Sequence, residues 1–142
     1  MRVLVLSSLL ALPACGNLPD PTPPAQGIYG YVRVDNQVGM TALPSFLVAA
    51  LPSTQVGSID QTTPTTPTDA DGNFSLQLDA GRWRVCLVDG TKTAQCDCNV
   101  NVGDGSQIER LYLRQSTSGA SVTGWTGQWR GGGVASSCNT VK

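Results

Sequence analysis

Two short runs of alternating apolar and polar residues, separated by a turn, dominate residues 68–88 of the chain. Residues 74–78 (FSLQL) and 83–87 (WRVCL) alternate with a period of two, which is typical of β-strands. Residues 71–73 (DGN) precede the first run and residues 79–82 (DAGR) separate the two, and Asp, Asn and Gly favour tight turns. The stretch therefore predicts a β-hairpin whose apolar face packs against the other strands of the domain.

The rest of the sequence indicates an all-β fold. Gly, Ser, Thr and Pro are abundant and no long helical periodicity is present. Further strands are predicted at residues 27–35, 44–52, 95–102 and 108–113, with a weak candidate at 55–60 and a polar loop at 62–68. Gly30 allows a close backbone approach or a bulge in the first of these strands. The predicted architecture is an antiparallel β-sandwich of about seven strands.

Charge and composition exclude several classes of function. Nine Lys and Arg residues against ten Asp and Glu give a formal net charge of −1, and the basic residues are scattered, so no electrostatic footprint for nucleic acid is present. The chain has no histidine, which removes Ser/His/Asp and Cys/His catalytic arrangements and the commonest zinc ligand. An acidic pair such as Asp97 and Glu109 is the remaining hydrolytic hypothesis, and no motif supports it. We predict a protein that is not an enzyme and that carries no metal or cofactor.

Residues 1–14 have the pattern of an export signal. Arg2 is followed by an apolar run that is too short for a stable membrane span, so the segment is predicted to be cleaved. Residues 12–15 (LPAC) resemble the lipobox of bacterial lipoproteins, with Leu at −3, a small residue at −1 and Cys at +1, although Pro13 departs from the usual residue at −2. The resemblance implies that Cys15 becomes the first mature residue and carries a diacylglyceryl group. The alternatives are an ordinary secreted protein and a structural Cys15.

A proline-rich tether is predicted between the lipid and the domain, over residues 15–26. Residues 17–26 contain four of the nine prolines of the chain, which favours an extended polyproline spacer. Such a spacer would lift the domain off the lipid surface. Gly16 and Asn17 lack the acidic residue that favours inner-membrane retention. By analogy with lipoprotein sorting, we expect an outer-membrane anchor with the domain periplasmic or surface-facing.

Several motifs of residues 27–113 resemble one known domain family. These are Gly30-Tyr31-Val32, residues 68–76 (TDADGNFSL), residues 78–85 (LDAGRWRV) and the closing residues 108–113. Together they look like the carboxypeptidase regulatory-like domain, with Trp83 in place of the usual Tyr and an atypically long insertion at residues 53–67. The resemblance implies a transthyretin-like or Ig-like β-sandwich over residues 27–114. It licenses the architecture and only weakly a function.

Four cysteines remain if Cys15 is lipidated, namely Cys86, Cys96, Cys98 and Cys138. An even number in an exported chain predicts two disulfides. Cys96 and Cys98 share one face of a strand, so Cys86 should bond one of them and Cys138 the other. Cys86 alternates in phase with two outward-facing arginines, whereas Cys96 is in phase with Val100, which conflicts with a bridge between them. A bulge would reconcile the two faces. A metal site at this C-x-C pair is disfavoured because no histidine or second pair accompanies it.

Residues 115–142 form a Gly/Ser-rich C-terminal arm that contains Trp125 and Trp129. Both rings could pack on the sandwich, or they could join Trp83 in an exposed stacking platform for a glycan or a protein. Residues 69–73 (DADGN) resemble a calcium loop but lack its closing glutamate, so a turn is predicted there. The function predicted from the sequence is a non-catalytic, lipid-anchored envelope module with a structural or protein-interaction role. The alternative is a carbohydrate- or peptidoglycan-binding module.

Overall fold

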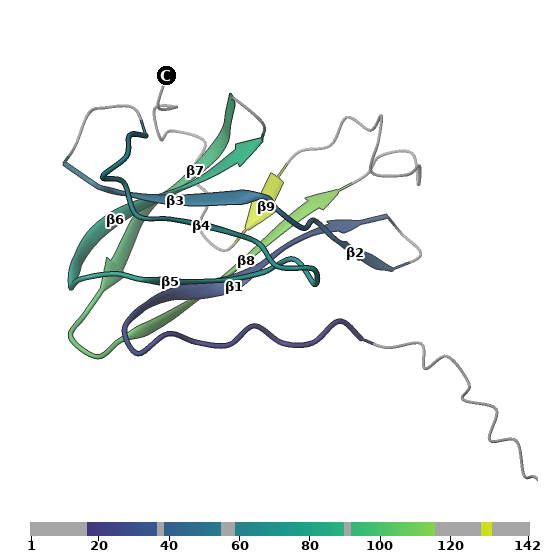
Figure 1. Cartoon of the computed structure of the whole chain (residues 1–142), viewed down its shortest axis with the longest axis horizontal. Coiled ribbons are helices and arrows are strands. Elements are labelled where there is room, and N and C mark those ends of the chain that lie inside the picture. Colours follow the sequence, from purple (N-terminus) through teal and green to yellow (C-terminus); the bar gives the residue numbers. More distant parts are fainter. Residues whose placement is uncertain (1–16, 37–38, 55–58, 90–91, 116–128, 132–142) are drawn as a thin grey trace, which may run out of the picture.

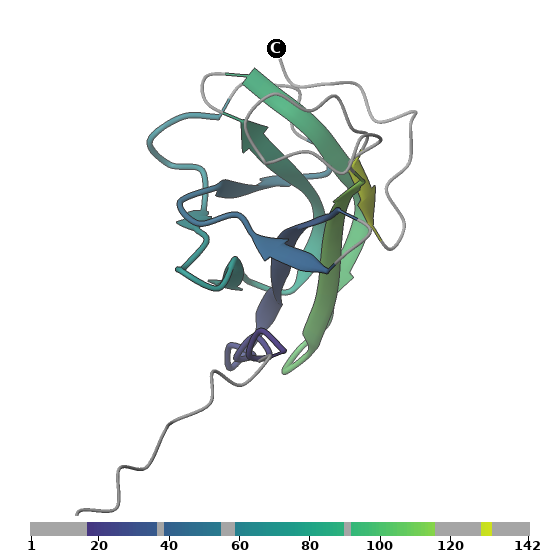
Figure 2. The same cartoon turned by 90° about the vertical axis from the view of Figure 1, so that its right-hand side faces the viewer.

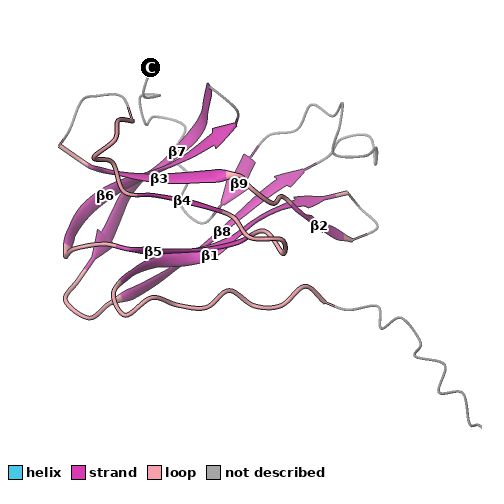
Figure 3. Ribbon diagram, viewed as in Figure 1, coloured by secondary structure: helices cyan, strands magenta, loops and turns pink. Residues whose placement is uncertain are grey.

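A computed structural model describes residues 17–36, 39–54, 59–89, 92–115 and 129–131. The described residues form nine strands and no helix (Figures 1 and 3). The strands are β1 (Gly27–Asp35), β2 (Met40–Ala42), β3 (Leu47–Pro52), β4 (Thr65–Pro67), β5 (Asn73–Gln77), β6 (Gly81–Asp89), β7 (Lys92–Val102), β8 (Gln107–Gln115) and β9 (Trp129–Gly131). They belong to two sheets, so the all-β prediction is confirmed.

Strand β1 is the centre of the first sheet, whose main order is β2-β1-β8-β9. Along one edge β1 pairs antiparallel first with β5 and then with β2. Along the other edge it pairs with β8 in parallel, from Gly27 opposite Gln107 to Asp35 opposite Gln115. The parallel pair departs from the predicted all-antiparallel arrangement. The long separation in sequence between β1 and β8 leaves room for the crossover that a parallel pair requires.

The second sheet is antiparallel throughout, in the order β4-β3-β6-β7. Its inner strand β3 is buried on both faces, because Val48, Ala49, Ala50 and Leu51 each have at most 1% of their surface exposed. This confirms the interpretation of the apolar run at residues 44–52 as a buried strand. The run at 62–68 was predicted as a loop, and that prediction is wrong for its last part, because β4 pairs there with β3.

The predicted hairpin at residues 74–87 does not form, and this is the main correction to the sequence analysis. Strand β5 lies in the first sheet and β6 in the second, so the turn between them crosses from one layer to the other (Figures 1 and 2). Phe74 and Leu76 on β5 and Val85 and Leu87 on β6 belong to the same core cluster. The alternation therefore identified the inward face of each strand correctly, but the two faces meet across the core and not side by side.

The two sheets enclose one hydrophobic core, which is the arrangement of a β-sandwich (Figure 2). Its buried members come from both layers: Ile28, Val32, Val34, Leu43, Phe74, Leu76 and Tyr112 with the first sheet, and Val48, Ala50, Val85, Leu87, Val100 and Val102 with the second, together with Leu78 in the turn. The predicted strand at residues 55–60 falls largely outside the described residues. Of the C-terminal arm the structure describes Gln115, which ends β8, and β9, which pairs with residues 112–114 of β8.

At Gly30 the backbone of β8 lies where the side chain of any other residue would begin. A β-carbon at this position would lie 1.6 Å from the carbonyl oxygen of Arg110. Backbone atoms of a paired strand cannot move aside without breaking the ladder, so only glycine fits here. Of the two alternatives predicted for Gly30, a close backbone approach or a bulge, the structure shows the close approach.

We expect Gly30→Ala to lower the free energy of unfolding by about 3 kcal/mol, because the added methyl group forces β1 and β8 apart. Gly103→Ala is the matched control. There the added β-carbon would meet only the Ser106 hydroxyl, at 2.9 Å, and that side chain can rotate away. Urea unfolding followed by circular dichroism measures both, and equal losses in the two variants would contradict the argument.

Candidate functional site

A bulge in β7 decides which of its side chains face the core. Trp83 pairs with Val100, but Val85 pairs with Asp97, so β7 has one residue more than β6 over this stretch. Asn99, inside the bulge, has a φ of 62°, a left-handed conformation that asparagine tolerates better than most residues. A bulge of the kind that would reconcile the phases of the two cysteines is therefore present. Val100 and Cys96 consequently point to opposite faces of the sheet.

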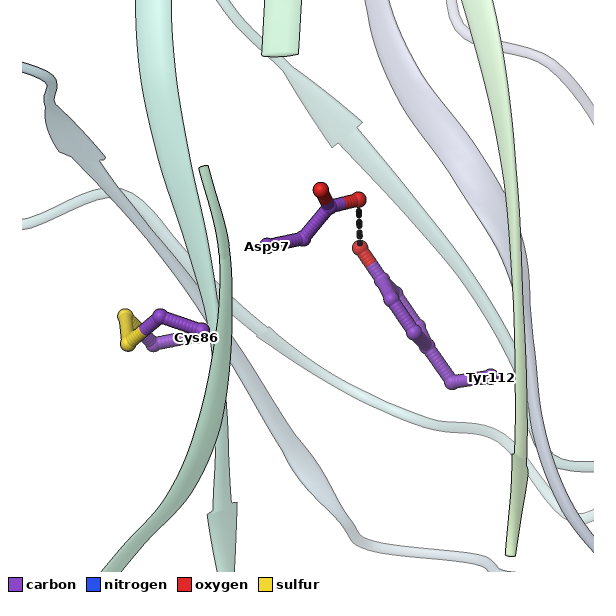
Figure 4. The surroundings of a disulfide bond; sticks show 4 residues. Cys86, Asp97 and Tyr112 are labelled. Carbon is purple, nitrogen blue, oxygen red and sulfur yellow. Dashed lines mark hydrogen bonds between the residues drawn. A yellow bond between two sulfur atoms is a disulfide. The ribbon is translucent and has the colours of Figure 1, made fainter. Parts of the chain in front are cut away.

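The same bulge directs Asp97 into the space between the sheets (Figure 4). Only 2% of Asp97 is exposed. Its Oδ2 accepts a hydrogen bond of 3.2 Å from the hydroxyl of Tyr112 on β8, and the Arg110 Nε lies 3.0 Å from the same oxygen. The other oxygen, Oδ1, is buried and accepts no hydrogen bond from the part of the chain that the structure describes. The cluster of Asp97, Arg110 and Tyr112 thus joins the two sheets through one half-satisfied carboxylate.

Burial raises the pKa of the Asp97 carboxyl above its usual value, and the opposing effects of the Arg110 charge and the Tyr112 hydrogen bond do not cancel it. Burial, and then the negative charge of Asp97, also raise the pKa of Tyr112 well above its usual value. Tyr112 therefore keeps its proton and remains the donor. The contact between Arg110 Nε and Asp97 Oδ2 does not have hydrogen-bond geometry. The ion pair therefore offsets only part of the free energy needed to bury the carboxylate.

The structure does not bring together the two carboxylates that the sequence offered as a hydrolytic pair. Asp97 points into the sandwich, whereas Glu109 is exposed. Arg110 and Tyr112 alternate with Glu109 along β8 and point inward, so Glu109 lies on the outer face of the first sheet. The pairing hypothesis is wrong because it ignored the face on which each carboxylate emerges.

Cys86 and Cys96 form a disulfide on the outer side of the second sheet, opposite Asp97 (Figure 4). The two residues are direct partners in the β6–β7 ladder, with their Cα atoms 4.0 Å apart. They pack with Leu51 and Ile59 in a small second cluster. Cys98 is also disulfide-bonded. The predicted partner of the second bridge, Cys138, lies outside the described residues.

The proline-rich segment does not stand away from the domain as a spacer. Over its described part, residues 17–26, it lies against the sandwich (purple in Figure 1). The carbonyl of Pro19 accepts hydrogen bonds from Arg33 Nη2 at 2.9 Å and from Asn73 Nδ2 at 3.1 Å. The carbonyl of Pro24 accepts one from Gln107 Nε2 at 2.8 Å. Proline lacks an N–H but keeps its carbonyl, so side chains of the domain supply the donors that a strand ladder would otherwise supply.

Gln26 fixes the other end of this segment. Its amide donates to the Leu78 carbonyl at 2.9 Å, and its side-chain oxygen accepts from the Gly105 N–H at 2.7 Å. Leu78 lies in the connection between β5 and β6, and Gly105 lies in the connection between β7 and β8. The segment therefore runs along the sandwich between two fixed points, and we call the Pro19 carbonyl with its donors Arg33 and Asn73 the Pro19 latch.

Arg33 is the central residue of the Pro19 latch. Only 5% of the residue is exposed. Its side chain donates to the Asp71 carbonyl and to Asn73 Oδ1, and its guanidinium carbon lies 4.1 Å from the centre of the Tyr31 ring. A groove of about 720 Å³ lies beside it, lined in part by Leu18, Tyr31 and Met40. Sequence reasoning missed this site, because nothing in the alternation of β1 distinguishes Arg33 from an ordinary solvent-facing arginine.

The turn at residues 69–73 has the geometry that was predicted for it. Asp69 Oδ1 accepts from the N–H groups of Asp71 and Asn73, both at 2.9 Å, and Gly72 has a φ of 76°. The Asp71 carbonyl in turn accepts from Arg33. The Asp and Gly residues therefore serve backbone geometry and hold the donors of the Pro19 latch in place.

Of the three tryptophans predicted to stack on a ligand, only the Trp83 side chain is described. It is half-buried against the main core, and its Nε1 donates to the Asp79 carbonyl at 2.9 Å. Trp83 lines a groove of about 280 Å³ together with Pro52 and Thr62. Trp129 begins β9, but its side chain and the whole of Trp125 lie outside the described residues. The indole N–H that a stacking platform would offer to a ligand is therefore already hydrogen-bonded within the protein at Trp83.

Comparison with known proteins assigns the chain to no family. It matches no protein-family model, no curated protein and no solved structure. Within the described ranges, no helix has the length and apolarity needed to cross a membrane. Among the same residues, no three Cys, Asp or Glu side chains lie close enough together to hold a metal ion.

We expect the Asp97 carboxyl to make stability fall as the pH rises. Its pKa is higher in the folded than in the unfolded chain, so the folded state binds more protons above pH 3.8, the usual value. Its favourable contribution is therefore complete at low pH and is lost as the pH rises through the folded pKa. Asp97→Asn should remove this slope, measured as the difference from wild type in urea unfolding over a pH series.

Asp60→Asn is the control for this titration. Asp60 is exposed, and hydrogen bonds from Thr62 and Thr63 lower its pKa below 3.8. Its contribution is present above that value and is lost only as the pH falls below it. The difference in stability between each variant and wild type should therefore change with pH on opposite sides of pH 3.8, above it for Asp97→Asn and below it for Asp60→Asn. Changes over the same pH range would contradict the assignment of Asp97.

We expect the double variant Cys86→Ala/Cys96→Ala to lose roughly 2–3 kcal/mol of unfolding free energy, as the chain-entropy model gives for a bridge that closes so short a loop. The bridged residues are separated by 10 positions in the sequence. Urea unfolding under oxidising conditions measures the loss. An unchanged unfolding free energy would contradict a stabilising role of the bridge.

Proposed function

We propose that the chain is a non-catalytic, lipid-anchored module of the bacterial cell envelope with a structural or protein-interaction role. The observation that carries the proposal is the position of Cys15, four residues ahead of Pro19. The lipobox-like pattern thus ends directly before the segment that Arg33 and Asn73 hold against the sandwich. A lipid at this place would join the β-sandwich to a membrane through a short connection.

The use of polar groups within the fold supports a structural role. Backbone carbonyls accept hydrogen bonds from the side chains of Asn73, Arg33 and Gln26. Asp97 accepts a hydrogen bond from Tyr112 inside the sandwich. These groups hold the N-terminal segment and the two sheets together. Outer-membrane anchoring, with the domain periplasmic or surface-facing and an envelope protein as partner, is the destination that best fits the residues after Cys15.

We also propose a distant relation to the carboxypeptidase regulatory-like domain. Its support is the arrangement of the motifs that carry the resemblance: Gly30-Tyr31-Val32 lies in the central strand β1, directly beside the closing strand β8. The turn at residues 69–73 leads from the second sheet into β5. Such a transthyretin-like sandwich fits a binding or scaffolding task without specifying a ligand.

Intact-mass spectrometry of protein extracted from bacterial membranes tests the anchor. We expect a chain that begins at Cys15 and carries the mass of a diacylglyceryl group. Cys15→Ala should lose this mass and leave the membrane fraction, whereas the control Gly16→Ala should keep both. A wild-type chain that still begins at Met1, or that lacks acyl mass, would refute the proposal.

A further inference from the structure

The N-terminal segment places the start of the domain at one defined end of the sandwich. Pro19 is held near the end of β1 by Arg33, and Gln26 is held at the opposite end by Leu78 and Gly105 (Figure 1). We call the first of these the latch end and the second, with the turns at residues 78–81 and 103–106, the distal end. A segment fixed at both points cannot extend away from the domain as a free linker.

The chain between Cys15 and the Pro19 latch is too short to separate the domain from a bilayer. An extended chain covers at most about 3.5 Å per residue, so four residues span about 14 Å. The diacylglyceryl group of a lipidated cysteine inserts among the acyl chains, which holds its backbone at the headgroup level. Pro19 and the latch end must then stay within this distance of the headgroup layer.

The surface at the latch end suits contact with lipid headgroups. Met40 is 50% exposed and is the only large hydrophobic side chain exposed among the described residues. It shares the groove of about 720 Å³ with Leu18 and with Tyr31, an amphipathic residue type common at membrane interfaces. Asp20 and Arg33, in the same groove, have opposite charges, and Arg33 is committed to Pro19, Asp71 and Asn73. The contact therefore does not require anionic lipid.

On these grounds, and resting on the lipid anchor proposed above, we propose that the latch end docks on the headgroup layer of the membrane that holds the anchor. Met40, Leu18 and Tyr31 face the lipid. The distal end then points into the aqueous space, where a partner can reach it. The proline-rich segment is in this arrangement an orientation device and not a spacer.

Spin labelling of the full-length lipidated protein in vesicles of phosphatidylethanolamine and phosphatidylglycerol tests the orientation. Met40 at the latch end or Asp104 at the distal end is replaced by p-acetylphenylalanine and coupled to a nitroxide, which leaves the cysteines untouched. We expect the label at position 40 to lose collisions with a water-soluble nickel chelate and to keep collisions with oxygen. The label at position 104 should remain fully accessible to the chelate.

An insertion variant supplies the matched control. Ten Gly and Ser residues between Gly16 and Asn17 leave the Pro19 latch and the sandwich intact but lengthen the connection to the lipid. We expect the protection at position 40 to be lost in this variant, because the short connection no longer holds the latch end down.

The outcomes separate this inference from the anchor itself. Equal chelate accessibility at positions 40 and 104, in protein whose mass shows the lipid, would overturn the orientation and leave the anchor standing. If the label at position 40 is protected from the chelate in native membranes but not in vesicles that contain no other protein, the latch end contacts a protein partner. This result would overturn the lipid contact. A chain without acyl mass would refute the anchor and, with it, this inference.

Discussion

The pairing of β1 along both edges is the constraint on which the rest of the molecule depends. Its parallel ladder with β8 runs the full length of the strand, and it is possible at this spacing because position 30 has no side chain to meet the Arg110 carbonyl. The same strand supplies the inward core residues Ile28 and Val32 and the outward Arg33 that holds Pro19. One strand therefore positions both the core and the N-terminal segment.

The bulge in β7 is the second constraint, because it decides which side chains of the strand face outward and which face the core. On one side of the bulge Cys96 points outward to Cys86, and past it Val100 points into the core. The cost of this arrangement is a buried carboxylate at Asp97, of which Tyr112 and Arg110 satisfy one oxygen. Burying a charge that is half satisfied is unfavourable. The disulfide beside it offsets part of this cost, since it limits the unfolded chain.

Sequence alternation predicted which residues face the core but not which strands are neighbours. Phe74, Leu76, Val85 and Leu87 are buried as expected, yet their strands lie in opposite sheets. A period of two gives the face of a strand, whereas pairing depends on whether the turn stays in one layer or crosses to the other. For the same reason the sequence left both Cys96 and Cys98 as possible partners of Cys86. Only the register of the β6–β7 ladder selects Cys96. Sites that need a tertiary partner, such as Arg33 with Pro19, leave no periodic signal at all.

The proline-rich segment shows why composition alone misjudges a linker. Prolines exclude a strand ladder, and a run of them is stiff and extended in isolation. Stiffness also lowers the entropy lost when such a segment is fixed against a surface, so a few donors aimed at its carbonyls suffice to hold it. Arg33, Asn73 and Gln107 supply these donors at intervals along the sandwich. A segment held in this way fixes the position of the domain relative to its first residue. The reason is that the residues between Pro19 and the core strand β1 are hydrogen-bonded to the sandwich and cannot change their conformation as a flexible tether would.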